Sequence, residues 1–499
     1  MLSIEDMAAF CRRKGFVYPS ADIYGGIAGF WDFGHLGVGL KNAVKQELWR
    51  SFVLRREDIV GIDGSIITNP LVWKASGHLE SFTDLLLPCK KCGHRTRADL
   101  FLQDKGISAE GMSPQQIAGL LKKHKLSCEK CGGAFGSAHA FNLMFSTAVG
   151  PASGFTAYLR PETAQSIFPN FALVMEHNRM KLPFGIAQLG KAFRNEISPR
   201  DFLFRSREFE QFELEFFVDP GQLHHDDLLK DALELEVQVL TAEMQREKQE
   251  HASLTIKQMH QQKLGNPWQL YWLAQFHQWF LLHGIRKENL RIREHLKDEL
   301  AHYALSCFDI EYRFPFGWKE IHGNADRGAY DLKQHMQHAQ SDLTVFQEER
   351  REKIIPLVAS EPSQGIERAL LAFLFDAYED SKERGNVVLH LDSRLAPVQV
   401  AVFPLVNKLI TDARQIAEHL RQHFTVFFDK SGSIGRRYAR QDEIGTPYCI
   451  TIDFDSLQKK DATIRDRDTT QQVRVKIAEL PAVLRQLISQ EIPFAELQK

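Results

Sequence analysis

The sequence has 499 residues, of which 43% are hydrophobic and 25% are charged, and its formal net charge is −2. A chain of this length exceeds what one hydrophobic core usually supports, so we expect two or three globular domains. The near-neutral charge excludes a strongly basic or acidic protein, so any contact with nucleic acid must come from local basic patches.

The N-terminal residues and the cysteines bear on where the chain is found. The segment MLSIEDMAAFCRRKG has acids and arginines where a signal peptide needs an apolar run, and no 18 consecutive residues are apolar. We therefore expect a cytoplasmic protein with no membrane partner. Four of the seven cysteines form two CxxC pairs, which in such a protein favours metal binding over disulfides.

Residues 22–50 begin with a glycine-rich aromatic segment and continue with an amphipathic pattern after Gly39, where we expect a helix. The glycines indicate turns and close packing. A phosphate-binding loop is disfavoured, because no hydrophobic strand precedes the glycines and no GK[ST] sequence follows them.

Residues 83–145 form a predicted insertion that contains both cysteine pairs, Cys89 with Cys92 and Cys128 with Cys131, and each pair is followed by glycine. A helix is expected between the pairs, over QQIAGLLKKHK. Four thiolates suit tetrahedral zinc in a closed structural site. The alternatives are an empty remnant of such a site, free core cysteines, or a redox CxxC pair, which would leave the second pair unexplained.

Residues 193–217, FRNEISPRDFLFRSREFEQFELEFF, predict a hairpin in which Phe193–Glu196 pairs with a second strand over 204–217. Alternation places Phe204, Phe212, Leu214 and Phe216 on one side and Arg205, Arg207, Phe209, Gln211, Glu213 and Glu215 on the other. Arginine forks suit phosphate oxygens, and a planar ring suits a nucleobase. The alternative is a structural strand laced by surface ion pairs, each contributing little.

The region from about 219 to 305 is charged, and its apolar residues recur at three- and four-residue spacing, as in KENLRIREHLKDELAHYA. We therefore expect a helical insertion. Strand and turn signals resume at 306–334, and EPSQGIERALLAFLFDAYED runs from a turn into an apolar helix. From about residue 398 to the end, alternating strand and helix patterns predict a separate α/β domain.

Several of these segments together resemble one family. FRNE followed by a loop and Arg205-Ser206-Arg207-Glu208-Phe209 is similar to motif 2 of class II aminoacyl-tRNA synthetases, and EPSQGIER is similar to motif 3. With GGIAGFWDFGHLGVGLKNAV, FNLMF, YLRPETAQSIF and RQDEIGTP, the match extends from about residue 15 to 480 and resembles the dimeric type of glycyl-tRNA synthetase. Two positions differ from that family: His35 in GHLG stands where proline is usual, and SFTDLLLPC, the motif 1 region that builds the dimer interface in the family, lacks the usual aspartate-proline order and has Pro88 two residues later.

The resemblance implies an α+β catalytic domain over residues 1–390, built on an antiparallel sheet flanked by helices, and an anticodon-binding domain over 398–499. It implies a homodimer that uses ATP and Mg²⁺ to activate glycine and then charges tRNA-Gly. In the second domain, Arg436, Arg437 and Arg440 would cluster with Tyr438 near the tRNA, although RRYARQDE is equally typical of a charged helix.

The resemblance also assigns a nucleotide site. Arg194 and Arg368 would be catalytic, Glu196 would accept from the adenine amino group, Phe209 would stack on adenine, and Glu320 would hold magnesium. The expected ATP-binding residues are Arg194, Asn195, Glu196, Phe204, Arg205, Phe209, Glu320, Ile321, Gly365 and Arg368.

For glycine the resemblance implies an acidic pocket around the ammonium group, too small for a methyl group. The expected residues are Arg97, Glu162, Gln211, Glu213, Arg327, Glu361 and Ser363. Two other functions are considered, a catalytically inactive synthetase-like RNA-binding protein and a ligase for another amino acid or acceptor. The first would be expected to lose Arg194 or Arg368, and the second to change Glu162, Glu213 or Ser363.

Overall fold

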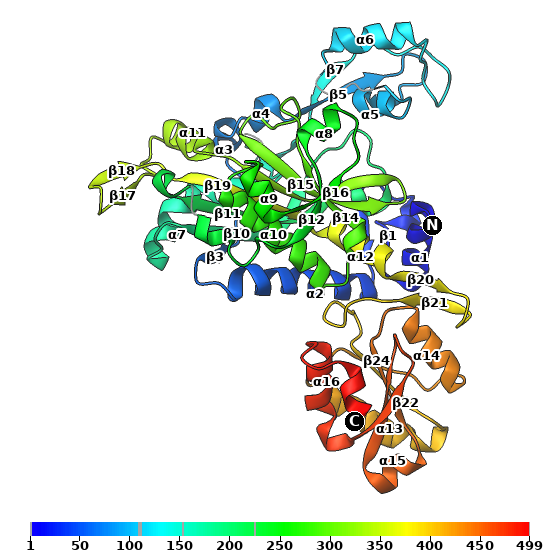
Figure 1. Cartoon of the computed structure of the whole chain (residues 1–499). Helices are drawn as coiled ribbons and strands as arrows, with labels where there is room; N and C mark the ends of the chain where they lie inside the picture. Colours follow the sequence, from blue (N-terminus) through cyan, green and yellow to red (C-terminus); the bar gives the residue numbers. More distant parts are fainter. Residues whose placement is uncertain (1, 108–111, 152–153, 224–225, 499) are drawn as a thin grey trace.

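The structure, a computed structural model, describes residues 2–107, 112–151, 154–223 and 226–498. Its centre is a nine-stranded sheet with strand order β13-β12-β14-β15-β16-β19-β11-β10-β3 (Figure 1). Only the pairs β3–β10 and β12–β14 are parallel, so the predicted α+β class with an antiparallel sheet is confirmed. The strands are β3 (Ile59–Ile62), β10 (Phe184–Phe193), β11 (Glu208–Val218), β12 (Glu236–Leu240), β13 (Ala252–Thr255), β14 (Leu290–Glu294), β15 (Ser306–Phe314), β16 (Gly317–Asp326) and β19 (Leu357–Gly365).

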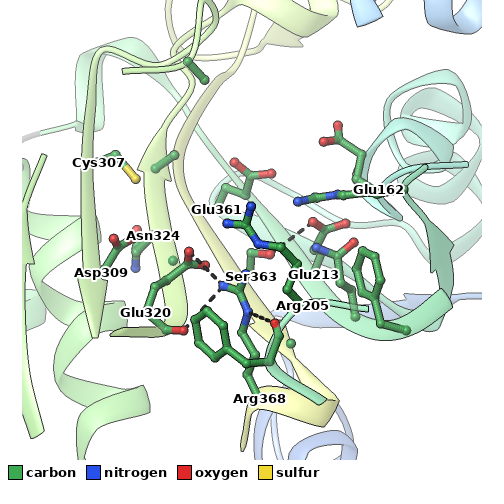
Figure 2. A pocket seen from close by; sticks show the side chains of 18 of the residues that line it. Glu162, Arg205, Glu213, Cys307, Asp309, Glu320, Asn324, Glu361, Ser363 and Arg368 are labelled. Atoms are coloured by element: carbon green, nitrogen blue, oxygen red, sulfur yellow. Dashed lines mark hydrogen bonds and ion pairs between the residues drawn. The ribbon is translucent and has the colours of Figure 1, made fainter. Parts of the chain in front are cut away.

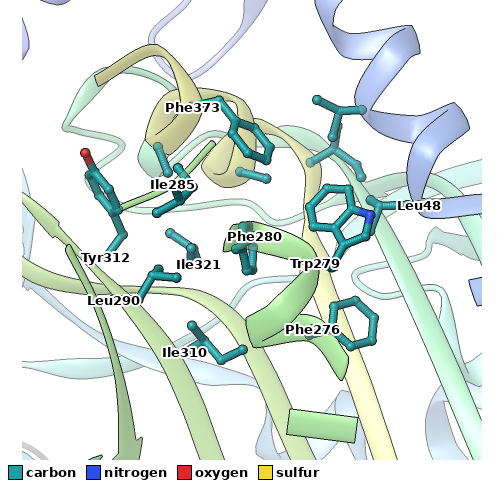
Figure 3. Packing of buried hydrophobic residues seen from close by; sticks show 14 of the residues in the cluster. Leu48, Phe276, Trp279, Phe280, Ile285, Leu290, Ile310, Tyr312, Ile321 and Phe373 are labelled. Atoms are coloured by element: carbon teal, nitrogen blue, oxygen red, sulfur yellow. The ribbon is translucent and has the colours of Figure 1, made fainter. Parts of the chain in front are cut away.

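One face of this sheet packs against helices through the largest hydrophobic core. α10 (Pro267–Leu282) and α12 (Ile366–Ala377) are buried on most sides, and α2 (His35–Trp49) contributes one face. Figure 3 shows the part of this core where these helices meet β14, β15 and β16. On the other face, α7 (Phe171–Asn178) and α11 (Tyr330–Ala339) cover part of the sheet around a smaller core, and the remaining part carries polar side chains.

The strand β11 shows the predicted alternation. Phe212, Leu214 and Phe216 enter the core, and the ring of Phe216 lies 4.9 Å from that of Trp268 on α10. The strand begins at Glu208, however, and Phe204 lies in a separate 3-10 turn, Phe202–Phe204. The expectation that alternation starts at Phe204 is therefore wrong.

The helix α2 starts at His35, five residues before Leu40, the first position after Gly39 at which a helix is expected. A Cβ atom on Gly37 would lie 1.9 Å from the carbonyl oxygen of Phe16. Glycine at this position lets the first helical turn pack closely against the backbone of Phe16. It lies inside the helix and does not mark the end of a loop.

Shorter elements surround the central sheet. The helices are α1 (Ile4–Lys14), α3 (Pro70–Ala75), α4 (His78–Ser81), α7 (Phe171–Asn178), α8 (Ala242–Arg246), α9 (Ile256–Gln261) and α11 (Tyr330–Ala339). The strands are β1 (Val17–Pro19), β2 (Trp31–Phe33), β4 (Ile67–Thr68), β8 (Phe145–Val149), β9 (Phe155–Leu159), β17 (Val345–Gln347), β18 (Glu352–Ile354), β20 (Tyr378–Ser381) and β21 (Asn386–Leu389).

The cysteine-bearing segment projects from the rest of the chain (Figure 1). It has a three-stranded sheet of order β6-β5-β7 and two helices, of which the second confirms the helix expected between the cysteine pairs. The elements are β5 (Thr83–Pro88), β6 (Arg95–Arg97), α5 (Ala98–Gln103), α6 (Pro114–Lys123) and β7 (His139–Asn142). Residues 108–111 of the predicted insertion lie outside the described part of the chain.

The expectation of a helical segment over 219–305 is wrong in part. β12, β13 and β14 belong to the central sheet, and only α8, α9 and α10 are α-helices in the described residues of this region. In LRIRE of β14 the charges have partners across the sheet, since Arg291 donates to Glu311 on β15 at 2.6 Å. Such cross-strand pairs cannot be distinguished from helical i,i+4 pairs by spacing alone.

The C-terminal elements form a second layered unit with its own core (Figure 1). A five-stranded sheet has the order β23-β22-β24-β25-β26, and the expected alternation of strands and helices is confirmed. The elements are β22 (Val400–Pro404), α13 (Ile410–Leu420), β23 (Val426–Phe428), α14 (Ile434–Asp442), β24 (Tyr448–Ile452), α15 (Phe454–Lys459), β25 (Asp461–Asp466), β26 (Gln472–Lys476) and α16 (Leu480–Ile488). Across the described residues, every helix is too short or too polar to cross a membrane.

The buried His277 of α10 predicts loss of stability in acid. Burial lowers the pKa of His277 to about 4, so between pH 6.5 and 4 the unfolded chain binds a proton that the folded chain excludes. We expect this residue to reduce the free energy of unfolding by roughly 3 kcal/mol over that interval, measured by denaturant titration. His277→Leu should flatten the pH dependence, whereas His124→Gln, on an exposed side chain, should not. Equal pH dependence in wild type and His277→Leu would contradict this origin.

Candidate active site

The polar face of the central sheet carries a cavity. Its walls come from β11, β16, β19, the first turn of α12, the turn Phe202–Phe204 and the segment between β14 and β15. Arg194, Phe209 and Arg368 all line this one cavity, although they come from separate parts of the chain. Figure 2 shows side chains from these elements converging on one space.

One end of the cavity is cationic and aromatic. Arg194 follows β10, donates from Nε to the Pro161 carbonyl at 3.1 Å, and lies 5.3 Å from the centre of the Phe209 ring. On the other side Arg368 lies 4.5 Å from the Phe204 ring. These guanidinium groups are held against rings and carbonyl oxygens, which leaves N–H groups directed at the cavity.

Carboxylates accompany two of the arginines at this end. Arg368 Nη1 lies 2.8 Å from Glu320 Oε2, a contact drawn in Figure 2. Arg205 Nη1 and Glu196 Oε2 are 3.7 Å apart, and neither of these buried atoms has a hydrogen-bond partner among the described residues. Since buried polar atoms normally have partners, this donor and this acceptor point to a ligand or water in the cavity.

The other end of the cavity is acidic, with Glu162, Glu213 and Glu361 buried along it. Glu213 Oε2 accepts from Thr163 N at 2.6 Å and from Ala164 N at 2.7 Å, and Oε1 accepts from Ser363 Oγ at 3.1 Å. Burial, followed by the negative charge of Glu162, raises the pKa of Glu213. The three donors hold the Glu213 side chain in one position.

Glu162 lies beside a histidine and Glu361 beside an arginine. Glu162 Oε2 lies 3.3 Å from His78 Nε2, and although burial opposes ionisation, His78 and Arg327 lower the pKa of Glu162 below its ordinary value. Glu361 accepts from Arg327 at 2.6 Å, yet burial raises the pKa of Glu361 to about 8. The acidic end is therefore partly neutralised by protonation as well as by pairing.

Arg327 lies behind this acidic wall and is fully buried. It donates to both oxygens of Asp331 at 2.7 and 2.9 Å, and the Tyr303 ring lies 3.7 Å from its guanidinium carbon. Asp331 and Glu361 thus accept hydrogen bonds from the guanidinium group, and the Tyr303 ring covers one of its faces. Arg327 therefore acts as the internal counter-ion of the pocket.

Glu215 lies beneath the acidic end and is fully buried, with neither carboxyl oxygen hydrogen-bonded among the described residues. On β11 it follows Glu213 by two residues, so it points to the same face. Burial, and next the charge of Glu361, raise the pKa of Glu215 well above its ordinary value. This environment therefore disfavours the ionised form of Glu215.

The four cysteines of the insertion meet in one cluster. Cys89 and Cys131 sulfurs are 3.5 Å apart, those of Cys92 and Cys128 are 3.8 Å apart, and all four lie within 4.8 Å of one another. Gly93 and Gly132 have φ values of 69° and 66°, and their N–H groups return to the carbonyls of Cys89 and Cys128. Glycine after each CxxC therefore permits the tight turn that brings each pair of thiols together.

The chain is similar to proteins of known family over nearly its full length. The tRNA synthetase class II core domain (G, H, P, S and T) matches residues 154–375, and an anticodon binding domain matches residues 399–487. Glycine–tRNA ligase of Caldanaerobacter subterraneus subsp. tengcongensis is 44% identical over 494 residues, covering 97% of this chain and 98% of that protein. That of Bacillus anthracis is 42% identical over 499 residues, covering 98% of this chain and all of the relative. The chain belongs to the glycine–tRNA ligase family.

Most of the residues expected from the resemblance to this glycine–tRNA ligase family line the cavity. They are Arg194, Glu196, Phe204, Arg205, Phe209, Glu320, Gly365 and Arg368 at the cationic end, and Glu162, Gln211, Glu213, Glu361 and Ser363 toward the acidic end. EPSQG, expected as a turn, is the end of β19, and α12 begins directly after Gly365. The strand therefore places Glu361 and Ser363, and the helix places Arg368.

Four expected residues do not line the cavity. The side chain of Ile321 is wholly buried in the hydrophobic core, and Asn195 donates its backbone N–H to Leu143 at 2.8 Å. Arg327 reaches the cavity only through the acids that it pairs with. Arg97 pairs with Asp84 at 2.7 Å and with Asp99 at 2.8 Å. The placement of Arg97 at the amino-acid end is thus not reproduced, because these two carboxylates hold its guanidinium on the insertion.

Several functional neighbours were missed from the sequence. Two of them can be found from the sequence. Thr163 is adjacent to Glu162, and Asp331 lies four residues after Arg327, a spacing at which opposite charges meet on a helix. Tyr303 and His295 had no such signal, because the segment that contains them was assigned to a helix.

The basic cluster of the C-terminal unit is less exposed than expected. Arg437 is buried and donates to the Pro404 carbonyl at 2.6 Å, and Tyr438 shares a hydrogen bond with Thr451 at 2.6 Å. These two side chains therefore hold α14 to its sheet. Arg436 remains exposed on this helix.

Removing the internal counter-ion should destabilise the protein. Arg327→Met would leave Asp331 and Glu361 buried without their cation, and we expect a loss of about 3–5 kcal/mol in the free energy of unfolding. The loss should be smaller in acid, where the carboxyl groups are protonated. Lys353→Ala, which breaks an exposed pair with Asp342, should cost at most about 1 kcal/mol. Similar unfolding curves for Arg327→Met and Lys353→Ala would refute the role of Arg327.

Proposed function

We propose that this chain is a glycine–tRNA ligase, which activates glycine with ATP to glycyl-adenylate and then esterifies the 3′ end of tRNA-Gly. The observation that carries the proposal is that, in a chain of this family, one cavity joins a cationic aromatic end to an acidic end. The first end suits a nucleotide triphosphate, and the second suits an ammonium group.

For the nucleotide, Arg194 would hold the α-phosphate and stabilise the charge that develops there. Arg205 and Arg368 would hold the γ-phosphate of a bent ATP. Phe209, beside Arg194, would stack on adenine, and Glu196 would accept from the adenine amino group. Arg205 Nη1 and Glu196 Oε2, which have no hydrogen-bond partner among the described residues, supply a donor and an acceptor for these contacts.

Magnesium would be held at the same end by carboxylates. A Cβ atom on Gly323 would lie 3.8 Å from Asp309 Oδ1 and 3.9 Å from Glu320 Oε1, so two carboxylates approach one point of the wall. Hard oxygen ligands of this kind fit Mg²⁺. When bound, the ion would neutralise phosphate charge and orient the triphosphate.

For the amino acid, Glu162, Glu213 and Glu361 would surround the glycine ammonium group, with Ser363 beside them. Discrimination would come from exclusion, because the methyl group of alanine would have to enter a space lined by paired carboxylates. In a hydrophobic pocket, two substrates that differ by one methylene differ in binding free energy by only ~1–3 kcal/mol. Burying carboxylates against a methyl group costs more free energy than this.

The remaining assignments follow the family. The C-terminal unit over 398–499 would bind the anticodon region of tRNA-Gly, and residues 1–390 would form the catalytic domain. We also propose a homodimer and a cytoplasmic location.

The activity can be tested by ATP–pyrophosphate exchange with each of the twenty amino acids, in which glycine alone should support exchange. Glu213→Gln should raise KM for glycine at least tenfold, because a charged acceptor worth ~1.5–3 kcal/mol is lost. Glu208→Gln on the same strand, which removes a surface pair with Lys191, is the matched control. Absence of exchange with every amino acid would favour a catalytically inactive synthetase-like protein. Exchange with an amino acid other than glycine would favour a ligase for that amino acid. An unchanged KM in Glu213→Gln would exclude the pocket assignment.

We propose that the cysteine cluster holds structural Zn²⁺. Four sulfurs within 4.8 Å match a closed tetrahedral site. The insertion has only a small core, made of Leu87, Ala98, Phe101, Leu102, Ile117 and Ala138 with partly buried neighbours. A small unit of this kind commonly needs a metal for stability.

Loss of this zinc should unfold the insertion selectively. Cys128→Ser, or treatment with a strong chelator, should increase proteolytic cleavage within 83–142 at least tenfold while the rest of the chain stays resistant, as followed by mass spectrometry. Cys11→Ala, at a buried cysteine in α1, should leave the cleavage rate of the insertion unchanged. Equal cleavage of Cys128→Ser and wild type would argue against a metal at this cluster.

A further inference from the structure

A second group of potential metal ligands lies on the wall of the cavity, outside the cysteine cluster. His295 follows β14, and Cys307 and Asp309 lie two residues apart on β15, so both point to one face of the sheet. Figure 2 shows Cys307 and Asp309 on the same strand beside the cavity. One ligand atom from each of the three residues lies within 4.8 Å of the other two.

The contacts within this trio hold its ligand atoms together. His295 Nε2 lies 2.7 Å from Asp309 Oδ2, and the backbone N–H of His295 donates to the Cys307 carbonyl at 2.9 Å. The backbone bond fixes the spacing between the end of β14 and β15, so the imidazole and the thiol come from a rigid frame. All three residues line the cavity, so a dissolved ion can reach them.

The donor set determines which ion fits. One nitrogen, one sulfur and one oxygen are the ligands of borderline cations such as Zn²⁺, whereas Mg²⁺ takes oxygen ligands. Bonds of about 2.0–2.3 Å place the ligand atoms of tetrahedral zinc about 3–4 Å apart. The 2.7 Å between His295 and Asp309 is shorter than this separation and the 4.8 Å limit for the trio is longer, so the three side chains would adjust by about an ångström to bind one zinc ion.

We propose that His295, Cys307 and Asp309 form a binding site for Zn²⁺ or a similar borderline divalent cation, separate from the four-cysteine cluster. A three-ligand site leaves the fourth position to water or to Glu320, whose carboxylate approaches Asp309 across Gly323. Binding of the ion would release two protons to solvent, the one shared by His295 and Asp309 and the one on the Cys307 thiol.

A functional consequence rests on the proposed ligase activity. Asp309 and Glu320 are also the carboxylates that approach one point near the expected triphosphate. Zinc on Asp309 removes that oxygen ligand from Mg²⁺ and adds a cation at a different place on the wall. Micromolar Zn²⁺ should therefore inhibit adenylate formation, and a chelator should restore the rate.

Zinc binding is measured first, without reference to activity. The full chain is stripped with chelator, dialysed against buffered Zn²⁺, and its metal content is determined by mass spectrometry. Wild type should bind one equivalent of zinc per chain more than Cys307→Ser and one more than His295→Gln. Cys449→Ala, at a buried cysteine of β24, should match wild type. Circular dichroism melting curves confirm that each variant is folded.

The competing explanation is an ion pair between His295 and Asp309 with Cys307 as a neighbour and no metal. In that case Cys307→Ser and wild type bind the same amount of zinc, and the proposal is overturned. The two variants change different ligands. If one of them does not fold, the zinc content of the other can still be compared with that of wild type.

Inhibition is then measured in the exchange assay, each protein relative to its own zinc-free rate. At a zinc concentration that lowers the exchange rate of Cys307→Ser less than twofold, the exchange rate of wild type should fall at least tenfold. Excess chelator should restore the wild-type rate. Equal inhibition of both would show that zinc acts elsewhere and would overturn the functional consequence. Absence of glycine-dependent exchange in zinc-free wild type, with the difference in bound zinc intact, would refute the ligase proposal and leave the metal site standing.

Discussion

The acidic end of the cavity depends on the burial of one cation among carboxyl groups. Arg327 donates to Asp331 and Glu361, lies 4.0 Å from Glu162, and has the Tyr303 ring against its face. Removing charges from water is costly, and this arrangement persists because the guanidinium donors have acceptors with good geometry. The cation neutralises the wall from behind, so the acids can face the cavity and attract a positive group without unfolding the sheet.

The central sheet serves both packing and chemistry through the alternation of its strands. On β11, Phe212, Leu214 and Phe216 fill the core, and Gln211 and Glu213 face the cavity. The register of β11 with β19 pairs Glu213 directly with Ser363, and their side chains meet at 3.1 Å. A one-residue shift would move every polar side chain into the core, so the aromatic packing also fixes the geometry of the site.

The resemblance of short motifs to a known family predicted the antiparallel sheet and half of the residues that line the cavity, and the local alternation of strand and helix patterns predicted the C-terminal unit. Prediction from the sequence failed where contacts between distant segments decide the structure. Spacing along the chain predicts a helix over the residues of β14. It cannot reveal that the charges of this strand have partners on a neighbouring strand, such as Glu311. The same error hid His295 and Tyr303. The expectation that Arg97 lies near the amino acid comes from the family resemblance, which does not show that Asp84 and Asp99 hold its guanidinium.

The two ends of the cavity together impose a direction on the amino acid. On the proposed assignment, the acids attract the ammonium group of glycine and repel its carboxylate. The carboxylate is then turned toward Arg194, where the α-phosphate would lie, and the arginine reduces the repulsion between these two anions. Orientation of this kind removes much of the entropic cost of bringing two reactants together. A substrate with no side chain offers no other contact by which to orient it, so the separation of charge along the cavity is what places the nucleophile.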